Sequence, residues 1–271
     1  MRRVVGDRVE LALVDEGEGP AVLLLHGFPD SSYLWRKQVP ALVEAGFRVL
    51  APDLRGFGES DRPDAVEEYA ITRSLADMIA VLDGLGIERA HVIGHDYGAA
   101  LAWVTAGLAP ARVDRLVVLS VGHPNTLRHP SVAQREKFWY QLLFLFEGTA
   151  EELLTHDDWK LMREFSRGDG DQERWFADLS RPGALTAALN WYRANGRVES
   201  ELSSRPLPPI AASTLGLWSS GDNYLLEEGM LDSGEHVTGP WRYERIEGAS
   251  HWLQLDAPER VNELLLDFLR G

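Results

Sequence analysis

The sequence predicts an α/β fold in which a mostly parallel sheet is covered by helices on both faces. Short, continuously apolar runs alternate with segments of helical periodicity, which is typical of buried parallel strands joined by helices. The 271 residues are enough for one large core of this kind. Between about residues 125 and 210 the alternation stops and the sequence becomes helical and aromatic, which predicts an inserted all-helical cap.

The expected elements follow this pattern along the chain. Residues 9–14 alternate polar and apolar side chains, which is typical of a half-buried edge strand. Continuous apolar strands are expected at 21–25, 48–51, 91–93, 116–119, 215–218 and 242–246. Helices are expected at 31–45, 72–86, 98–109 and 258–269. We therefore assign residues 1–124 and 211–271 to the core and residues 125–210 to the cap.

Composition excludes several classes of partner and cofactor. A formal net charge of −15 leaves no basic stripe for nucleic acid. The chain has no cysteine, hence no disulfide or thiolate chemistry. We expect no metal and no cofactor, since no His/Asp/Glu cluster has metal-ligand spacing and no phosphate-binding glycine motif is complete. The sequence shows neither a secretory leader nor a long apolar run. We therefore expect no membrane span and a cytoplasmic location. The oligomeric state is left open.

The most informative segment is Gly94-His95-Asp96-Tyr97-Gly98, which lies between an apolar run and a helix-forming run. This strand–turn–helix context exposes the central side chain at the edge of a sheet, and the flanking glycines permit strained dihedral angles. A carboxylate held there is an ionised nucleophile suited to attack on an sp³ carbon, giving an alkyl ester. The following helix N-terminus favours the ionised form. A simple helix-capping role for Asp96 is the alternative.

Two further residues complete a candidate catalytic set. His251 follows the strand that ends at Ile246 and lies at the carboxyl edge of the sheet, where it suits a general base. Asp222 follows the preceding strand and can orient His251 through a hydrogen bond, with a solvated turn aspartate as the alternative. The resulting chain order is nucleophile, acid, histidine.

The oxyanion hole is expected to consist of two backbone N–H groups, those of Phe28 and Tyr97. Pro29 is a candidate for a preceding cis bond that aims the Phe28 amide inward, with a plain turn proline as the alternative. Asp53 is expected to fix its own loop, and His26 and His95 to structure theirs. The expected substrate pocket contains Phe28, Pro29, Tyr97, Trp139, Trp191 and Trp252, with Trp139 and Trp191 also serving as packing residues.

These motifs resemble the α/β-hydrolase superfamily over nearly the full length of the chain and, more narrowly, the soluble epoxide hydrolases. The residues that carry the match are His26-Gly27-Phe28-Pro29, residues 53–60, residues 94–98, Gly221-Asp222 and His251. The resemblance implies that two cap tyrosines, Tyr140 and Tyr192, donate protons to an epoxide oxygen. It further implies attack by Asp96, hydrolysis of the ester by water that His251 and Asp222 activate, and a vicinal diol as product. The expected partners are thus a lipophilic epoxide and water.

Other functions stay open at this point. A haloalkane or haloacid dehalogenase uses the same aspartate. Haloalkane enzymes favour Asn where Phe28 stands and Trp where Tyr97 stands, whereas fluoroacetate-type enzymes share the Phe but have Arg where Tyr97 stands. A binding protein of this fold that has lost turnover is a second alternative. A serine esterase is excluded because the chain contains no Gly-x-Ser-x-Gly. Tyr97 replaces the family's usual tryptophan, which leaves substrate selection open.

Overall fold

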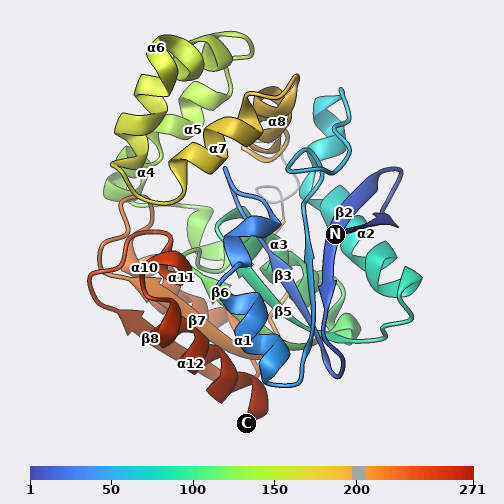
Figure 1. Ribbon diagram of the computed structural model, residues 1–271. Coiled ribbons are helices and arrows are strands. Elements are labelled where there is room, and N and C mark those ends of the chain that lie inside the picture. Colours follow the sequence, from blue (N-terminus) through green and yellow to red (C-terminus); the bar gives the residue numbers. More distant parts are fainter. Residues whose placement is uncertain (197–204) are drawn as a thin grey trace.

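The structure is a computed structural model that describes residues 1–196 and 205–271. Within these ranges the strands form one eight-stranded sheet in the order β1-β2-β4-β3-β5-β6-β7-β8 (Figure 1). β2 pairs antiparallel with β1 and β4, and the remaining pairs are parallel, which confirms the predicted fold class. The strands are β1 (Arg2–Val5), β2 (Glu10–Glu16), β3 (Ala21–Leu25), β4 (Arg48–Pro52), β5 (Ala90–His95), β6 (Val113–Leu119), β7 (Ser213–Ser219) and β8 (Trp241–Ile246).

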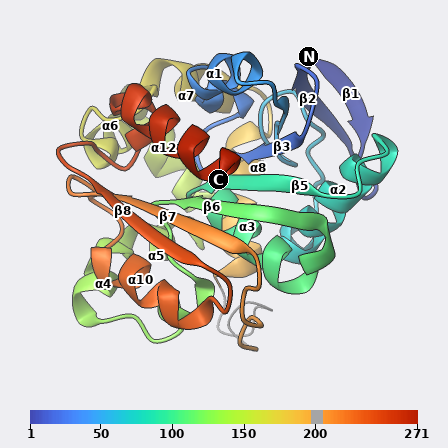
Figure 2. The same cartoon turned by 90° about the horizontal axis from the view of Figure 1, so that it is seen from below.

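Helices cover both faces of the sheet (Figure 2). α1 packs on α12 at one face, and α2 packs on α3 at the other. All six residues of β5 are buried between these layers, which explains an apolar run without alternation. The core helices are α1 (Gln38–Glu44), α2 (Ile71–Gly84), α3 (Tyr97–Leu108), α10 (Glu227–Leu231), α11 (Leu253–Asp256) and α12 (Pro258–Arg270). Short 3₁₀ turns are η1 (Ser32–Trp35), η2 (Val66–Tyr69), η3 (Pro110–Arg112), η4 (Pro124–Leu127) and η5 (Asp232–His236).

A helical cap is inserted after β6, the sixth strand. The cap helices lie together above the sheet in Figure 1. Its helices are α4 (Val132–Lys137), α5 (Trp139–Phe144), α6 (Thr149–Ser166), α7 (Gln172–Leu179) and α8 (Ala184–Asn195). α8 packs against α5 and α7 within the cap and against η2 of the core. The limits 125 and 210 stay a prediction, and residues 197–204 of that range lie outside the described part of the chain.

Two expectations for the N-terminal region were wrong. The strand expected at residues 9–14 is not at the edge, because Arg2–Val5 pairs with it on the outside as β1. The single helix expected at 31–45 is instead η1 followed by α1, which begins at Gln38. Pro40 explains this break, because a proline without an amide hydrogen is tolerated only in the first turn of a helix.

Candidate active site

Asp96 occupies a sharp turn between β5 and α3, with φ of 53° and ψ of −123°. A positive φ is costly for a residue with a side chain and persists only where the surroundings enforce it. The flanking glycines allow the close approach that does so. A Cβ on Gly94 would lie 2.1 Å from the Gly98 carbonyl oxygen, and a Cβ on Gly98 would lie 2.0 Å from the Leu25 carbonyl oxygen. The turn therefore holds the Asp96 carboxylate rigidly at the carboxyl edge of the sheet.

The two oxygens of Asp96 have different surroundings. Oδ1 accepts a hydrogen bond of 2.8 Å from the Phe28 backbone N–H. Oδ2 lies 3.4 Å from Nε2 of His251. Burial raises the pKa of Asp96, but the hydrogen bond and charge of His251, together with His95 and the Tyr97 N–H, outweigh it and lower the pKa. Asp96 is therefore an ionised carboxylate at neutral pH, as nucleophilic attack requires.

His251 links the two carboxylates of the predicted set. Its Nδ1 lies 2.8 Å from Oδ2 of Asp222, a buried side chain. The other Asp222 oxygen accepts the N–H groups of Tyr224 and Leu225 at 2.8 and 2.9 Å, which fixes the carboxylate. The structure thus brings Asp96, His251 and Asp222 together in the arrangement that the sequence predicts.

The charge state of His251 depends on these neighbours. Burial lowers the pKa of His251, but the charge and hydrogen bond of Asp222 and the adjacent Asp96 outweigh it and raise the pKa to about 10. His251 is therefore an imidazolium while both carboxylates are ionised. Any reaction that neutralises Asp96 removes one of the two charges that raise this pKa, so the imidazole becomes a better base at that moment.

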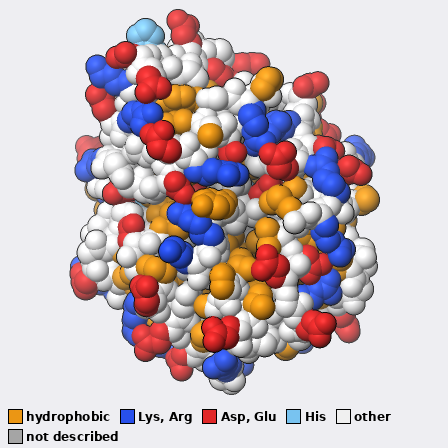
Figure 3. Space-filling view, in the orientation of Figure 1, with side chains coloured by type: hydrophobic (Ala, Val, Ile, Leu, Met, Phe, Trp, Pro, Cys, Tyr) orange, Lys and Arg blue, Asp and Glu red, His pale blue; other side chains and the backbone are white. Residues whose placement is uncertain are grey.

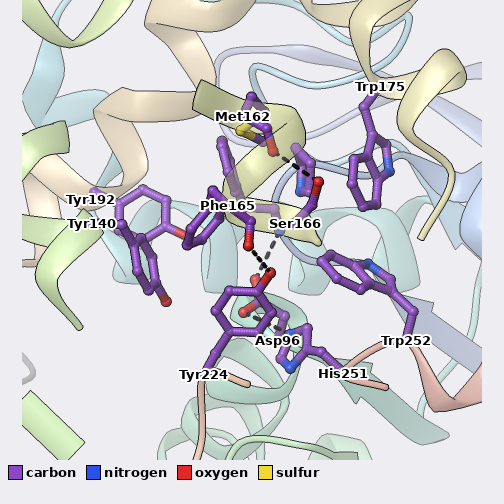
Figure 4. A pocket seen from close by; sticks show the side chains of 12 residues that line it. Asp96, Tyr140, Met162, Phe165, Ser166, Trp175, Tyr192, Tyr224, His251 and Trp252 are labelled. Atoms are coloured by element: carbon purple, nitrogen blue, oxygen red, sulfur yellow. Dashed lines mark hydrogen bonds and ion pairs between the residues drawn. The ribbon is translucent and has the colours of Figure 1, made fainter. Parts of the chain in front are cut away.

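Tyr140 and Tyr192 reach the same cavity from the cap. Their side chains are 5% and 4% exposed, and both line the cavity together with Asp96 and His251 (Figure 4). Burial raises the pKa of both phenols well above the ordinary value, and the charge of Asp96 raises it further. Both are therefore neutral hydroxyls that can donate a proton near the nucleophile.

The loop after β3 supplies the amide that faces Asp96. The Phe28–Pro29 bond is cis, as the sequence suggested. A Cβ on Gly27 would lie 2.4 Å from Asp96, so the backbone of this loop approaches the carboxylate very closely. The Phe28 ring packs on Phe144 and Tyr192 of the cap, with centroids 5.3 Å apart in both cases. One residue thus provides a backbone donor and part of the apolar wall.

Asp30 engages both tryptophans that line the cavity. Its two oxygens accept the indole N–H groups of Trp175 and Trp252 at 2.7 and 2.8 Å. Burial raises the pKa of Asp30 to about 7 despite these two donors. Because both indoles donate to Asp30, neither N–H is directed at a leaving halide. Asp30 also ties α7 of the cap to the segment that carries His251.

Three other predicted residues have structural roles. Asp53 accepts the N–H groups of Ser32 and Glu59, both at 2.8 Å, and so fixes the loop as expected. His26 accepts the Leu54 N–H at 2.9 Å. His95 contacts the His251 carbonyl oxygen at 2.9 Å, and burial lowers the pKa of its imidazole to about 3.

Three of the expected pocket residues do not line the cavity. Trp139 is 47% exposed and lies on the outside of α5, because its neighbour Tyr140 points inward on the same helix. Trp191 is buried and donates its N–H to the Arg55 carbonyl oxygen at 3.0 Å, so it fastens the cap to the core. The Tyr97 ring packs between Trp191 and Tyr192 behind the cavity wall, with centroids 5.3 and 4.9 Å away.

Sequence reasoning missed several residues that do line the cavity. They are Met162, Phe165 and Ser166 of α6, Trp175 of α7, and Tyr224. None of the cap residues belongs to a motif, and their approach depends on how the cap helices pack. Tyr224 offered a signal, because it lies two residues after Asp222 in the loop that follows β7. Phe28, Pro29 and Trp252 were expected and do line the cavity.

Three further features concern surface charge, groups of possible metal ligands and the length of the helices. Acidic and basic side chains are interspersed on the face in Figure 3, without a continuous basic stripe there. Across residues 1–196 and 205–271, no group of three His, Cys, Asp or Glu side chains is arranged to hold a metal ion. In the same ranges, no helix combines the length and apolar character needed to cross a membrane.

Comparisons with known proteins place the chain in a family. The family model described as alpha/beta hydrolase fold matches residues 20–258. Epoxide hydrolase A of Mycobacterium tuberculosis is 35% identical, over 100% of this chain and 97% of that protein. The chain belongs to the epoxide hydrolases. The family resemblance seen in the motifs is thereby confirmed.

Two other members of the epoxide hydrolase family extend the comparison. Human Epoxide hydrolase 4 is 33% identical over 98% of this chain and 76% of that protein. The crystal structure of Epoxide Hydrolase A from Mycobacterium thermoresistibile has a TM-score of 0.86 at 34% identity. That match covers 100% of this chain and 98% of the crystallised one, cap included.

Proposed function

We propose that this chain hydrolyses a lipophilic epoxide to a vicinal diol through a covalent alkyl ester on Asp96. The proposal depends mainly on one observation, that an ionised carboxylate, two neutral phenols and a paired imidazole share one cavity. Membership in the epoxide hydrolases supports it. The aromatic lining favours an apolar substituent on the substrate.

The first step opens the epoxide. Oδ1 of Asp96 already accepts the Phe28 N–H, so Oδ2 is the oxygen free to attack a ring carbon. As the new C–O bond forms, the ring C–O bond breaks and its electron pair stays on the epoxide oxygen. Tyr140 or Tyr192 donates its proton to that oxygen. The products of this step are a hydroxyalkyl ester and a tyrosinate.

Ester formation then changes the charge state of His251. The neutral ester no longer stabilises the imidazolium, so the pKa of His251 falls. The proton that His251 releases restores the phenol. His251 thereby becomes a neutral imidazole, still held at Nδ1 by Asp222, with Nε2 free to accept a proton from water.

The second step hydrolyses the ester. Water attacks the Asp96 carbonyl carbon and gives a proton to Nε2 of His251. The tetrahedral oxyanion develops on Oδ1, to which the Phe28 N–H donates. The Tyr97 N–H, which also hydrogen-bonds the Asp96 carboxylate, is the second proposed donor. Collapse breaks the bond between the carbonyl carbon and the alkoxide, and the carboxylic acid left at Asp96 passes its proton to the departing oxygen. The diol leaves, and Asp96 and His251 return to their ionised states.

No observation favours the dehalogenase alternative. The indole N–H groups of Trp175 and Trp252, which could hold a halide, both donate to Asp30. Purified protein should be offered styrene oxide and a haloalkane such as bromoethane, with diol and halide release measured. We expect diol from styrene oxide and no halide. Halide without diol would reverse the assignment, and neither product across a broad panel would favour a binding protein.

A second experiment tests the covalent step. His251→Gln keeps the Asp96 nucleophile but removes the base, so we expect it to form the ester and hydrolyse it slowly. Intact mass after exposure to styrene oxide should show one adduct, located by peptide mapping at Asp96. An unmodified protein that still binds the substrate would contradict covalent catalysis.

A further inference from the structure

The cavity over Asp96 is too small for a substrate in the structure. Its volume is about 20 Å³, which is room for about one or two water molecules. Among the described residues that line it, Phe165 and Asp96 are partly exposed and the others are buried. An epoxide with a hydrocarbon substituent is larger than this space. Part of the wall must therefore move before a substrate reaches Asp96.

A groove on the outside of the cap shares part of this wall. The groove has a volume of about 540 Å³ and lies between α4 and α6. Phe165 and Tyr224 line both the groove and the cavity. A second groove of about 410 Å³ around Tyr33 has no lining residue in common with the cavity. Of these two grooves, the one on the cap is thus separated from Asp96 by a shared pair of side chains.

One hydrogen bond and a ring contact join the shared pair, and both rings also pack on Tyr140. The Tyr224 hydroxyl donates to the Phe165 carbonyl oxygen at 3.0 Å, and the two rings lie 5.0 Å apart (Figure 4). The backbone of Tyr224 is anchored separately, because its N–H donates to Asp222. The Tyr224 ring can therefore rotate without releasing the carboxylate that orients His251. Phe165 lies one residue before the end of α6, where helices fray most easily.

The groove itself is suited to an apolar molecule. Trp139, 47% exposed, lies on it with its ring 5.9 Å from Phe165. Leu161 adds a second large apolar side chain. Glu136, Lys137, Glu164 and Arg167 supply charged groups along the same groove. Exposed apolar surface next to charged groups is typical of a binding site.

We propose that Phe165 and Tyr224 form the gate through which the epoxide passes from this groove into the catalytic cavity. The proposal depends on the proposed function, and it adds the entry route and a residue pair that selects substrates by size. Small epoxides need only a slight displacement of the Tyr224 ring. Large aryl epoxides need the hydrogen bond to Phe165 broken, so the gate affects them more.

Blocking the groove tests the route. The chain contains no cysteine, so one introduced thiol can be labelled without background. Ala133 is exposed, lines the groove and is not part of the cavity wall. We expect Ala133→Cys labelled with N-phenylmaleimide to lose about tenfold or more in kcat/KM for trans-stilbene oxide relative to the unlabelled variant. If the ester on Asp96 is formed before labelling, the rate constant for its hydrolysis should change by less than about twofold, because water is small enough to pass the label.

Tyr33→Cys with the same label is the matched control. Tyr33 is 45% exposed and lines the second groove. Labelled Tyr33→Cys should keep a kcat/KM for trans-stilbene oxide within about twofold of that of the unlabelled variant. An unchanged kcat/KM in labelled Ala133→Cys, or an equal loss in labelled Tyr33→Cys, overturns the route. Absence of diol from the unmodified protein is a different result, because it removes the proposed function itself.

Loosening the gate tests the pair directly. Tyr224→Phe keeps the ring and removes the hydrogen bond to Phe165. We expect the ratio of kcat/KM for trans-stilbene oxide to that for propylene oxide to rise about fivefold, as loss of one hydrogen bond allows. An unchanged or lower ratio contradicts a gating role, since a hydroxyl that serves only the chemistry affects both substrates alike.

Discussion

The core half and the cap half of the catalytic cavity are built in different ways. The core half consists of Asp96, His251 and Asp222, and hydrogen bonds of 2.8 Å from Phe28 to Asp96 and from His251 to Asp222 fix its geometry. The cap half places Tyr140 and Tyr192 by ring packing, with centroids of 5.4 and 4.9 Å to Phe144.

This difference indicates a division of tasks. Hydrogen bonds fix both distance and direction, which suits attack on a carbon atom and activation of a water molecule. Ring packing is less directional, so cap residues can shift while the cavity opens and closes. If the division is correct, changes in the core half should stop single chemical steps, and changes in the cap half should slow them.

The largest effect is expected at Asp96. Asp96→Ala removes the nucleophile and should lower turnover of styrene oxide by about 10⁴-fold or more, because no covalent intermediate forms. Diol formation measures the effect, and an unaltered circular dichroism spectrum controls for folding. Residual turnover within about 100-fold of the parent protein would show that water attacks the epoxide directly.

The pH dependence of stability tests the charges in the core half. The pKa of His251 rises from 6.5 to about 10 in the folded protein. A raised pKa gives stability that is fully present below pH 6.5 and is lost as the pH rises toward 10. We expect the free energy of unfolding to fall by roughly 4 kcal/mol across this window. Urea denaturation at several pH values measures the free energy of unfolding. In His251→Gln most of the decline with rising pH should be absent. A parallel decline in both proteins would contradict the assignment of this pH dependence to His251.

A smaller effect is expected in the cap half. Tyr140→Phe and Tyr192→Phe should each lower kcat/KM for propylene oxide by about 10- to 100-fold, since one acid remains in each variant. Phe146→Leu is the control, because Phe146 is an aromatic residue of the cap that is 62% exposed and lines neither the cavity nor the groove, and it should change kcat/KM by less than about twofold. Equal losses in all three variants would show that these aromatics act through cap packing alone.

The same division explains what the sequence could predict. The elbow, His251 and Asp222 lie at strand ends, where local motifs and chain order place them at one sheet edge. The cap phenols were identified only through their resemblance to family segments, and Trp139 was assigned wrongly beside them. Tertiary packing brings three other residues to the site, namely Phe165, Trp175 and Asp30. No local sequence motif marks these positions, so the sequence did not predict them. Strand β1 was missed because four residues with two arginines carry little periodicity.

The measurement that tests the central claim most directly is the fate of the oxygen atoms of Asp96. The protein should be incubated with excess styrene oxide in water enriched in heavy oxygen, and the peptide that contains Asp96 should then be analysed by mass spectrometry. If Asp96 forms the ester and water attacks its carbonyl carbon, heavy oxygen enters the Asp96 carboxylate. If turnover proceeds and the Asp96 carboxylate contains no heavy oxygen, the covalent mechanism is wrong.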